Sequence, residues 1–364
     1  MMVIAAWVAE ALVYLCFTCL LGGLLVSGIS SRRRPDVDVP KWIMIVSVLG
    51  IAILSFVPLW RIILFFAEDL GFWLTFKSVV FTFEEGKAYL LTVVLSIMLI
   101  LMLYWGDFRN DPLVSLLGAA ITFAMILALG WASHASSLYG LPGFIAHTIH
   151  FVGISVWCGI LFCIGWFARN HNHWREFLAW FSPVSIISVS MIGISGLIMM
   201  RLIVPEYYNS WILSYGQALL IKHLLIIPVV FFVLFNAYWM KKIVKSKPDY
   251  NPLPWFRGES ILLALIFITT GFMGQQTPPH DVSATLNETS PSPLFLLFYQ
   301  NPIQKSFEVN LALNLVTLSL LVVSVFAMAV MIASLMKKKQ VWIPVISGLV
   351  FVCSAYMALM ASIV

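Results

Sequence analysis

Ten long apolar runs constrain the fold of this chain more than any other feature of its sequence. Each run reaches about 20 residues or more, which is the length that an α-helix needs to cross a bilayer. The runs are continuously apolar instead of alternating, so a membrane β-barrel is disfavoured. They cover residues 3–29, 41–66, 87–106, 112–135, 143–168, 178–204, 216–240, 257–276, 308–336 and 341–363. The sequence therefore predicts an all-α, polytopic transmembrane helix bundle with about ten spans.

The composition is that of a chain whose main solvent is lipid. Hydrophobic residues make up 61% of the sequence and charged residues 10%, and the mean hydropathy is +0.98. A soluble chain of 364 residues would need more charge to cover its surface. The net charge of +5 comes mostly from short loops between the runs, so it indicates topology and not a nucleic-acid surface. The sequence contains no nucleotide-binding loop.

The distribution of Lys and Arg predicts the orientation of the bundle. Alternate loops carry fifteen basic residues on one side and three on the other, Lys77, Lys87 and Lys305. The fifteen are Arg32, Arg33, Arg34, Lys41, Arg109, Arg169, Arg175, Lys241, Lys242, Lys245, Lys247, Arg257, Lys337, Lys338 and Lys339. Because basic loops stay on the cytoplasmic side, we expect both termini to lie outside.

Ionisable residues inside spans are costly in lipid, which makes each of them a functional candidate. Here they gather in the outer half: Glu10, Arg61, His134, His147, His150, Arg201, Lys222 and His223. His134 is expected to close the span 112–135, whereas His147 and His150 open the next span after a short loop, 136–142. His147 and His150 are three residues apart, so both rings occupy one helix face.

These residues predict a metal site at the outer face, because imidazole is a good ligand for copper and zinc. The candidate ligands are His134, His147, His150 and His223. Cys158, Met191 and Met199 are candidates for a pathway inward, since thiolate and thioether sulfur select Cu(I). Glu10, Arg61, Arg201 and Lys222 are predicted to form a charged framework inside the membrane.

Each candidate also has a purely structural interpretation. His147 and His150 are compatible with packing and hydrogen bonding, and Cys158 with a small core residue. Glu10 is compatible with simple neutralisation of a basic side chain in the bundle. Paired histidines on neighbouring helices also suit the axial ligation of haem, so the sequence leaves copper and haem b open.

An ordered series of short motifs resembles the CopD family of bacterial copper-resistance and copper-uptake membrane proteins. The matching segments lie between residues 115 and 280. They are Ser133-His134-Ala135, His147-x-x-His150 followed by Gly153 to Gly159, Phe181-Ser182-Pro183, Ser195-Gly196, Tyr215 to Lys222, Asn236, Arg257-Gly258-Glu259 and Thr277-Pro278-Pro279.

The resemblance implies a copper-handling protein of the bacterial cytoplasmic membrane, with His134, His147 and His150 as the outer entry site. It divides the chain into an amino-terminal part at 1–111, a CopD-like core at 112–280, and an outer loop with two further helices at 281–364. An extracytoplasmic copper chaperone is the partner that such a function implies. A transporter or metal-delivery protein is favoured over an enzyme. The alternatives are a haem-binding redox protein and an assembly factor that delivers copper to a respiratory oxidase.

Overall fold

The computed structural model describes residues 2–303, 308–337 and 340–364. Lys305, Lys338 and Lys339, which entered the charge count above, lie outside the described residues. Within the described ranges the fold is all-helical, and ten spans are long and apolar enough to cross a membrane. The prediction of a polytopic helix bundle is thereby confirmed.

The ten spans follow one another along the chain, and two of them are built from more than one helical piece. They are α1 (Met2–Gly28), α2 (Lys41–Leu54) with α3 (Phe56–Leu70), α5 (Glu84–Trp105), α6 (Pro112–Trp131), α7 (His134–Phe167), α8 (Trp174–Ile203), α9 (Ser214–Leu234) with η3 (Phe235–Trp239) and α10 (Met240–Ser246), α11 (Leu253–Gly274), α14 (Leu315–Met336) and α15 (Trp342–Ala361). The shorter elements are η1 (Ser31–Arg33), α4 (Phe72–Phe81), η2 (Asn209–Ile212), α12 (Val282–Glu288) and α13 (Pro293–Leu296).

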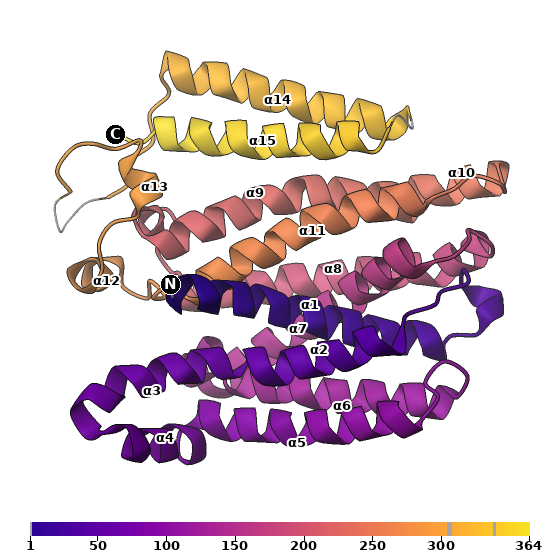
Figure 1. Cartoon of the computed structure of the whole chain (residues 1–364). Coiled ribbons are helices and arrows are strands. Elements are labelled where there is room, and N and C mark those ends of the chain that lie inside the picture. The colour runs from indigo at the N-terminus through magenta and orange to yellow at the C-terminus, as the bar shows by residue number, and fades with distance from the viewer. Residues whose placement is uncertain (1, 304–307, 338–339) are drawn as a thin grey trace.

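The helices lie roughly side by side, with both chain termini at the same end of the bundle (Figure 1). An even number of spans requires this arrangement, and the side of the membrane on which that end lies stays a prediction. Helix α1 packs against α2, α6, α7 and α11. The hairpin α14–α15 lies at the periphery and contacts the rest mainly through α9 and α11.

Side-chain caps explain several helix starts. Asp111 accepts a hydrogen bond from the Leu113 N–H at 2.8 Å, and Pro112 occupies the first turn of α6, where its missing N–H costs nothing. Ser133 caps α7 by accepting from the Ser136 N–H at 3.2 Å. This cap places His134 at the beginning of α7. The prediction from the sequence that it closes the preceding span was wrong.

Residues 136–142, which the sequence predicted to form a loop, belong to α7 in the structure. The helix is broken only at Gly140, whose φ of 57° lies in the left-handed region that favours glycine. The main part of α7 follows this break and carries Pro142 in its first turn. His134 therefore begins a short helical segment, and the break at Gly140 separates that segment from the main part of α7, which carries His147.

A close backbone contact between α1 and α7 positions the centre of the bundle. Gly22 of α1 faces Gly159 of α7, and a Cβ atom on either residue would collide with the backbone of the partner helix. Small residues at such a crossing allow transmembrane helices to approach closely and to gain van der Waals contact. The large buried side chains Phe17, Leu20 and Leu24 pack beside this contact on α1.

We predict that Gly159→Ala destabilises the protein by about 1–3 kcal/mol, because the added methyl group forces the two backbones apart. Gly193→Ala is the matched control, since a Cβ at Gly193 in α8 meets no atom within 4 Å. The unfolding free energy of both variants, measured in detergent micelles, checks this. Equal stability of the two variants would contradict the close contact.

Candidate functional site

His150 of α7 is fixed by hydrogen bonds to the neighbouring helix α8. Its Nδ1 lies 3.1 Å from the Ile192 carbonyl oxygen and 3.2 Å from the Ser195 Oγ. The Ser195 hydroxyl donates its proton to the Met191 carbonyl oxygen at 2.5 Å, so its oxygen is free to accept. Both neighbours of Nδ1 are thus acceptors. The proton of the neutral ring belongs on Nδ1, which leaves the Nε2 lone pair free.

Two glycines make room for this ring between the helices. A Cβ on Gly196 of α8 would lie 3.2 Å from the His150 Cε1, and a Cβ on Gly153 of α7 would lie 3.0 Å from the Ile192 side chain. Both contacts are tighter than side chains normally make. The small residues noted in the sequence are therefore part of what allows His150 to reach the α8 backbone.

His147 lies one turn before His150 on the same face of α7. Its ring stacks on Phe151, with the ring centroids 6.3 Å apart. The Nδ1 of His147 is buried and has no hydrogen-bond partner among the described residues. A buried nitrogen without a partner is uncommon in folded proteins, and it makes His147 a candidate ligand.

His134 is exposed at the start of α7, and its electrostatic neighbours are Glu85 and His280. His147 lies within electrostatic range of both His134 and Lys222, and Lys222 also lies within range of His150. The structure thus brings His134, His147, His150 and Lys222 into one region of the bundle. No group of three or more His, Cys, Asp or Glu side chains in the described part of the chain is close enough to hold a metal ion.

His223 of α9 faces a different partner from the α7 histidines. Its Nδ1 lies 2.8 Å from the hydroxyl oxygen of Tyr207, a residue in the connection before η2, and the two rings are 5.4 Å apart. Burial raises the pKa of Tyr207 to about 12, so its hydroxyl stays protonated at neutral pH. The adjacent Lys222 has no hydrogen-bond or ion-pair partner within the described ranges.

The charged framework is connected only in part. Tyr14 donates to the Glu10 carboxylate at 2.5 Å, and the Gln275 amide also donates to it. The Gln275 carbonyl oxygen accepts a hydrogen bond from Arg61, so the amide bridges the two charges. Arg201 is exposed near the carboxyl end of α8, where a cation is favoured by the helix dipole.

The candidate pathway residues lie apart from the histidines. Cys158 is 1% exposed in the core of α7, and its thiol is free. Met191 contributes its backbone carbonyl to the Ser195 hydrogen bond. Met199 packs against a small apolar cluster that includes Val204 and Tyr215. Their role in a pathway stays a prediction.

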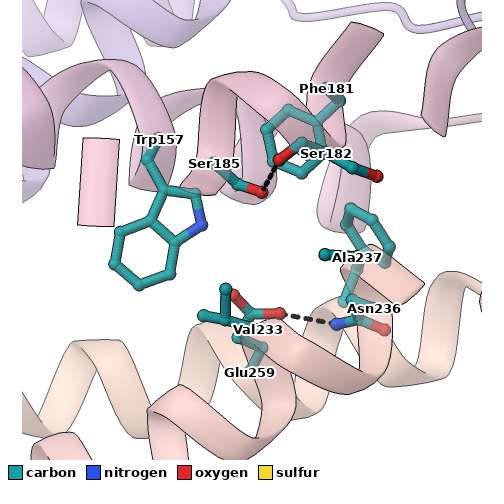
Figure 2. Close-up of a pocket in the computed structure, with 9 residues that line it drawn as sticks. Trp157, Phe181, Ser182, Ser185, Val233, Asn236, Ala237 and Glu259 are labelled. Carbon is teal, nitrogen blue, oxygen red and sulfur yellow. Dashed lines mark hydrogen bonds between the residues drawn. The ribbon is translucent and has the colours of Figure 1, made fainter. Parts of the chain in front are cut away.

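Sequence reasoning missed one polar site, in the half of the bundle away from the termini. Glu259 of α11 is 1% exposed and faces a pocket, together with Trp157, Ser182, Ser185 and Asn236 (Figure 2). The sequence presented Glu259 only as part of a helix-opening motif. The signal that could have revealed it is its position inside the apolar run 257–276, where an ionisable residue is costly.

These observations define a polytopic helical membrane protein with a pair of imidazoles, His147 and His150, on one face of α7. Residues 175–273 match the sequence profile of the family described as Copper resistance protein D, CopD. The chain therefore contains a CopD domain that extends from α8 to α11. The resemblance noted in the sequence is confirmed for this region. No curated protein and no solved structure matches the chain.

The matched region contains the hydrogen-bond partners of His150, but neither His147 nor His150 lies in it. Ile192 and Ser195, which contact His150, lie within residues 175–273, as do Asn236 and Glu259. His147 and His150 precede this region on α7. The division of the chain at 111 and 280 stays a prediction.

We predict that Gln275→Leu destabilises the protein by about 1–3 kcal/mol, because it leaves both Glu10 and Arg61 without the amide that joins them. Gln276→Leu is the control, since the Gln276 side chain donates only to the Phe272 carbonyl of its own helix turn. Thermal unfolding of the two variants in the same detergent makes the comparison. A larger loss in the control would count against the bridge.

We predict that Nδ1 of His150 carries the proton in the metal-free protein. Nitrogen-15 NMR of histidine-labelled protein distinguishes the two ring nitrogens, and the spectrum of His150→Asn assigns the signal. A proton on Nε2 would mean that the ring does not donate hydrogen bonds from Nδ1 to Ile192 and Ser195.

Proposed function

We propose that this protein binds copper through His147 and His150 in the outer half of the bundle and moves it across, or presents it at, the cytoplasmic membrane of a bacterium. The CopD match over residues 175–273 supports copper handling as the function of the chain. The observation that carries the finer proposal is the hydrogen bonding of His150, whose Nδ1 is held by α8.

This arrangement is the one that favours a histidine as a ligand. Histidines that bind metals usually donate their other ring N–H to a backbone carbonyl or a carboxylate, which fixes the tautomer and orients the ring. Ile192 supplies that carbonyl here. His147, one turn away with an unpaired Nδ1, supplies a second imidazole on the same face.

A pair of imidazoles suits the transient binding of a cuprous ion. Imidazole is a good copper ligand, and Cu(I) accepts two ligands in a nearly linear arrangement. Movement through a membrane protein requires binding that is weak enough to allow release. Two ligands with a nearby ammonium group meet this requirement, because Lys222 repels a cation at the site.

The other histidines have separate parts in this proposal. His134 is exposed at the start of α7 and would meet copper first, delivered as the free ion or by an extracytoplasmic chaperone. His223 would be a ligand only in the tautomer in which its Nδ1–H donates to the Tyr207 hydroxyl. Cys158 is not part of the proposed ligand set.

We predict that the purified protein binds about one Cu(I) per chain and that His147→Ala combined with His150→Ala reduces this to the background level. His171→Ala with His173→Ala is the matched control, since that pair lies in the loop at the opposite end of the bundle. Metal analysis after dialysis against a Cu(I) buffer gives the stoichiometry. Unchanged stoichiometry in the α7 double variant would refute the site.

The visible spectrum of the same preparation tests the haem alternative. A Soret band that disappears in His150→Ala would show that these residues bind haem b and not copper. Copper uptake into proteoliposomes separates movement across the membrane from presentation at its surface. A protein that binds copper through the α7 pair without any uptake would favour delivery to another membrane protein, such as a respiratory oxidase.

A further inference from the structure

The pocket around Glu259 lies in the half of the bundle away from the termini, between α7, α8, η3 and α11. Its cavity volume is about 10 Å³, which is about what a single water molecule needs, and it is lined by both aromatic and polar side chains. Figure 2 shows the Glu259 carboxyl beside the Asn236 amide, with the indole nitrogen of Trp157 directed into the same space. Nothing in the copper proposal uses this pocket.

Glu259 has a hydrogen bond on one oxygen only. Its Oε2 accepts from the Asn236 Nδ2 at 2.5 Å, whereas Oε1 is buried without a partner among the described residues. No Lys, Arg or His in the described ranges forms an ion pair with it. Arg257, two residues earlier, is turned away, because its Nε donates to the Gly165 carbonyl at 2.8 Å and its guanidinium lies over Trp166.

Most polar atoms around the carboxyl are also acceptors. The Asn236 Oδ1 is buried and unpaired, given that the amide nitrogen is bound to Glu259. The hydroxyls of Ser182 and Ser185 donate to the carbonyl oxygens of Leu178 and Ser182, at 2.8 and 2.9 Å. Their oxygens therefore offer only lone pairs. The indole N–H of Trp157 lies within electrostatic reach of the Glu259 carboxyl but makes no hydrogen bond of normal geometry.

An excess of acceptors around an uncompensated carboxylate requires something that supplies protons. An ionised carboxylate without a countercharge is strongly disfavoured inside a helix bundle in lipid. A proton on Glu259 removes the charge and creates a donor. A water molecule can then donate to the free oxygens and accept from Trp157, which is the set of partners that buried water usually finds.

The backbone next to the carboxyl also departs from the regular helix. Asn236 lies in η3, a single π-helical turn between α9 and α10. Short π-helical turns are rare, and they occur mostly at functional sites. Asn236 is the second residue of this turn, and its side-chain amide donates to Glu259.

We propose that Glu259 is an exchangeable proton-binding site in the membrane, served by water in the pocket that it shares with Asn236 and Trp157. The titratable group that faces it from α7 is the thiol of Cys158, which lies within electrostatic range. From α8 and η3 only serine, asparagine and apolar side chains line the pocket. The site does not depend on the copper ligands, and it gives the bundle a proton whose movement can be coupled to transport.

Infrared difference spectroscopy of the full chain in lipid tests the proposal, because a protonated carboxyl has a carbonyl-stretch band that an ionised one lacks. We expect a band that is present at low pH, disappears as the pH rises, and is absent from Glu259→Gln. The matched control Glu10→Gln removes another carboxyl within a span, which is bonded to Tyr14, and should keep this band. Asn236→Ala should shift the band in frequency, because it removes the hydrogen bond to Oε2.

Three results would overturn the assignment. A Glu259 band that is unchanged across the whole pH range in which the protein is folded would make the group a permanently neutral part of the core. If no band is removed by Glu259→Gln or shifted by Asn236→Ala, the Glu259 carboxylate is permanently ionised. Loss of the band on addition of sodium at constant pH would make the pocket a sodium site instead.

Discussion

The cost of an unpaired polar group in hydrocarbon is the constraint on which this bundle depends. Glu10 is bonded to Tyr14 of its own helix and to Gln275 after α11, and His150 is bonded to the backbone of α8. The hydrogen bonds from these groups to Gln275 and to α8 join different segments of the chain. They therefore also fix how the helices pack against one another. His147 and Glu259 are two of the buried groups in the described part of the chain that lack full pairing. An occupant from outside the chain is most expected where the protein itself leaves a polar atom unsatisfied.

Both unsatisfied regions lie along one interface, between α7 and α8. His150 and Trp157 are seven residues apart, which places them on the same face of α7 about 10 Å apart along its axis. The facing helix α8 contributes buried serines along this length, at Ser182, Ser185, Ser188 and Ser195. Gly153 allows the two helices to approach closely between the sites. A copper site and a proton site on one shared interface would be sensitive to the same small movement of α8 against α7.

The CopD match and the imidazole pair divide this interface between them. The matched region begins at residue 175, so it supplies α8 and everything that surrounds Glu259 except Trp157. Helix α7 supplies His147, His150 and Trp157 from outside the match. The matched region thus supplies the groups that hold His150 and most of the Glu259 pocket, whereas α7 supplies His147, His150 and Trp157. The close contact of Gly22 with Gly159 holds that helix against α1 and so connects the domain to the amino-terminal spans.

The sequence by itself determined the number of spans and the neighbourhood of His147 with His150. An apolar run long enough to cross a bilayer identifies a span. A spacing of three residues along a helix places two rings on one face. Only the tertiary structure decided that His150 bonds to Ile192, that His134 begins α7, and that Glu259 meets Asn236 across a π-helical turn. Such pairings depend on the shapes of facing helix surfaces, which the residues of each helix taken separately do not contain. Hydrophobic periodicity reports whether a position is apolar, but in lipid it does not report which helix that position touches.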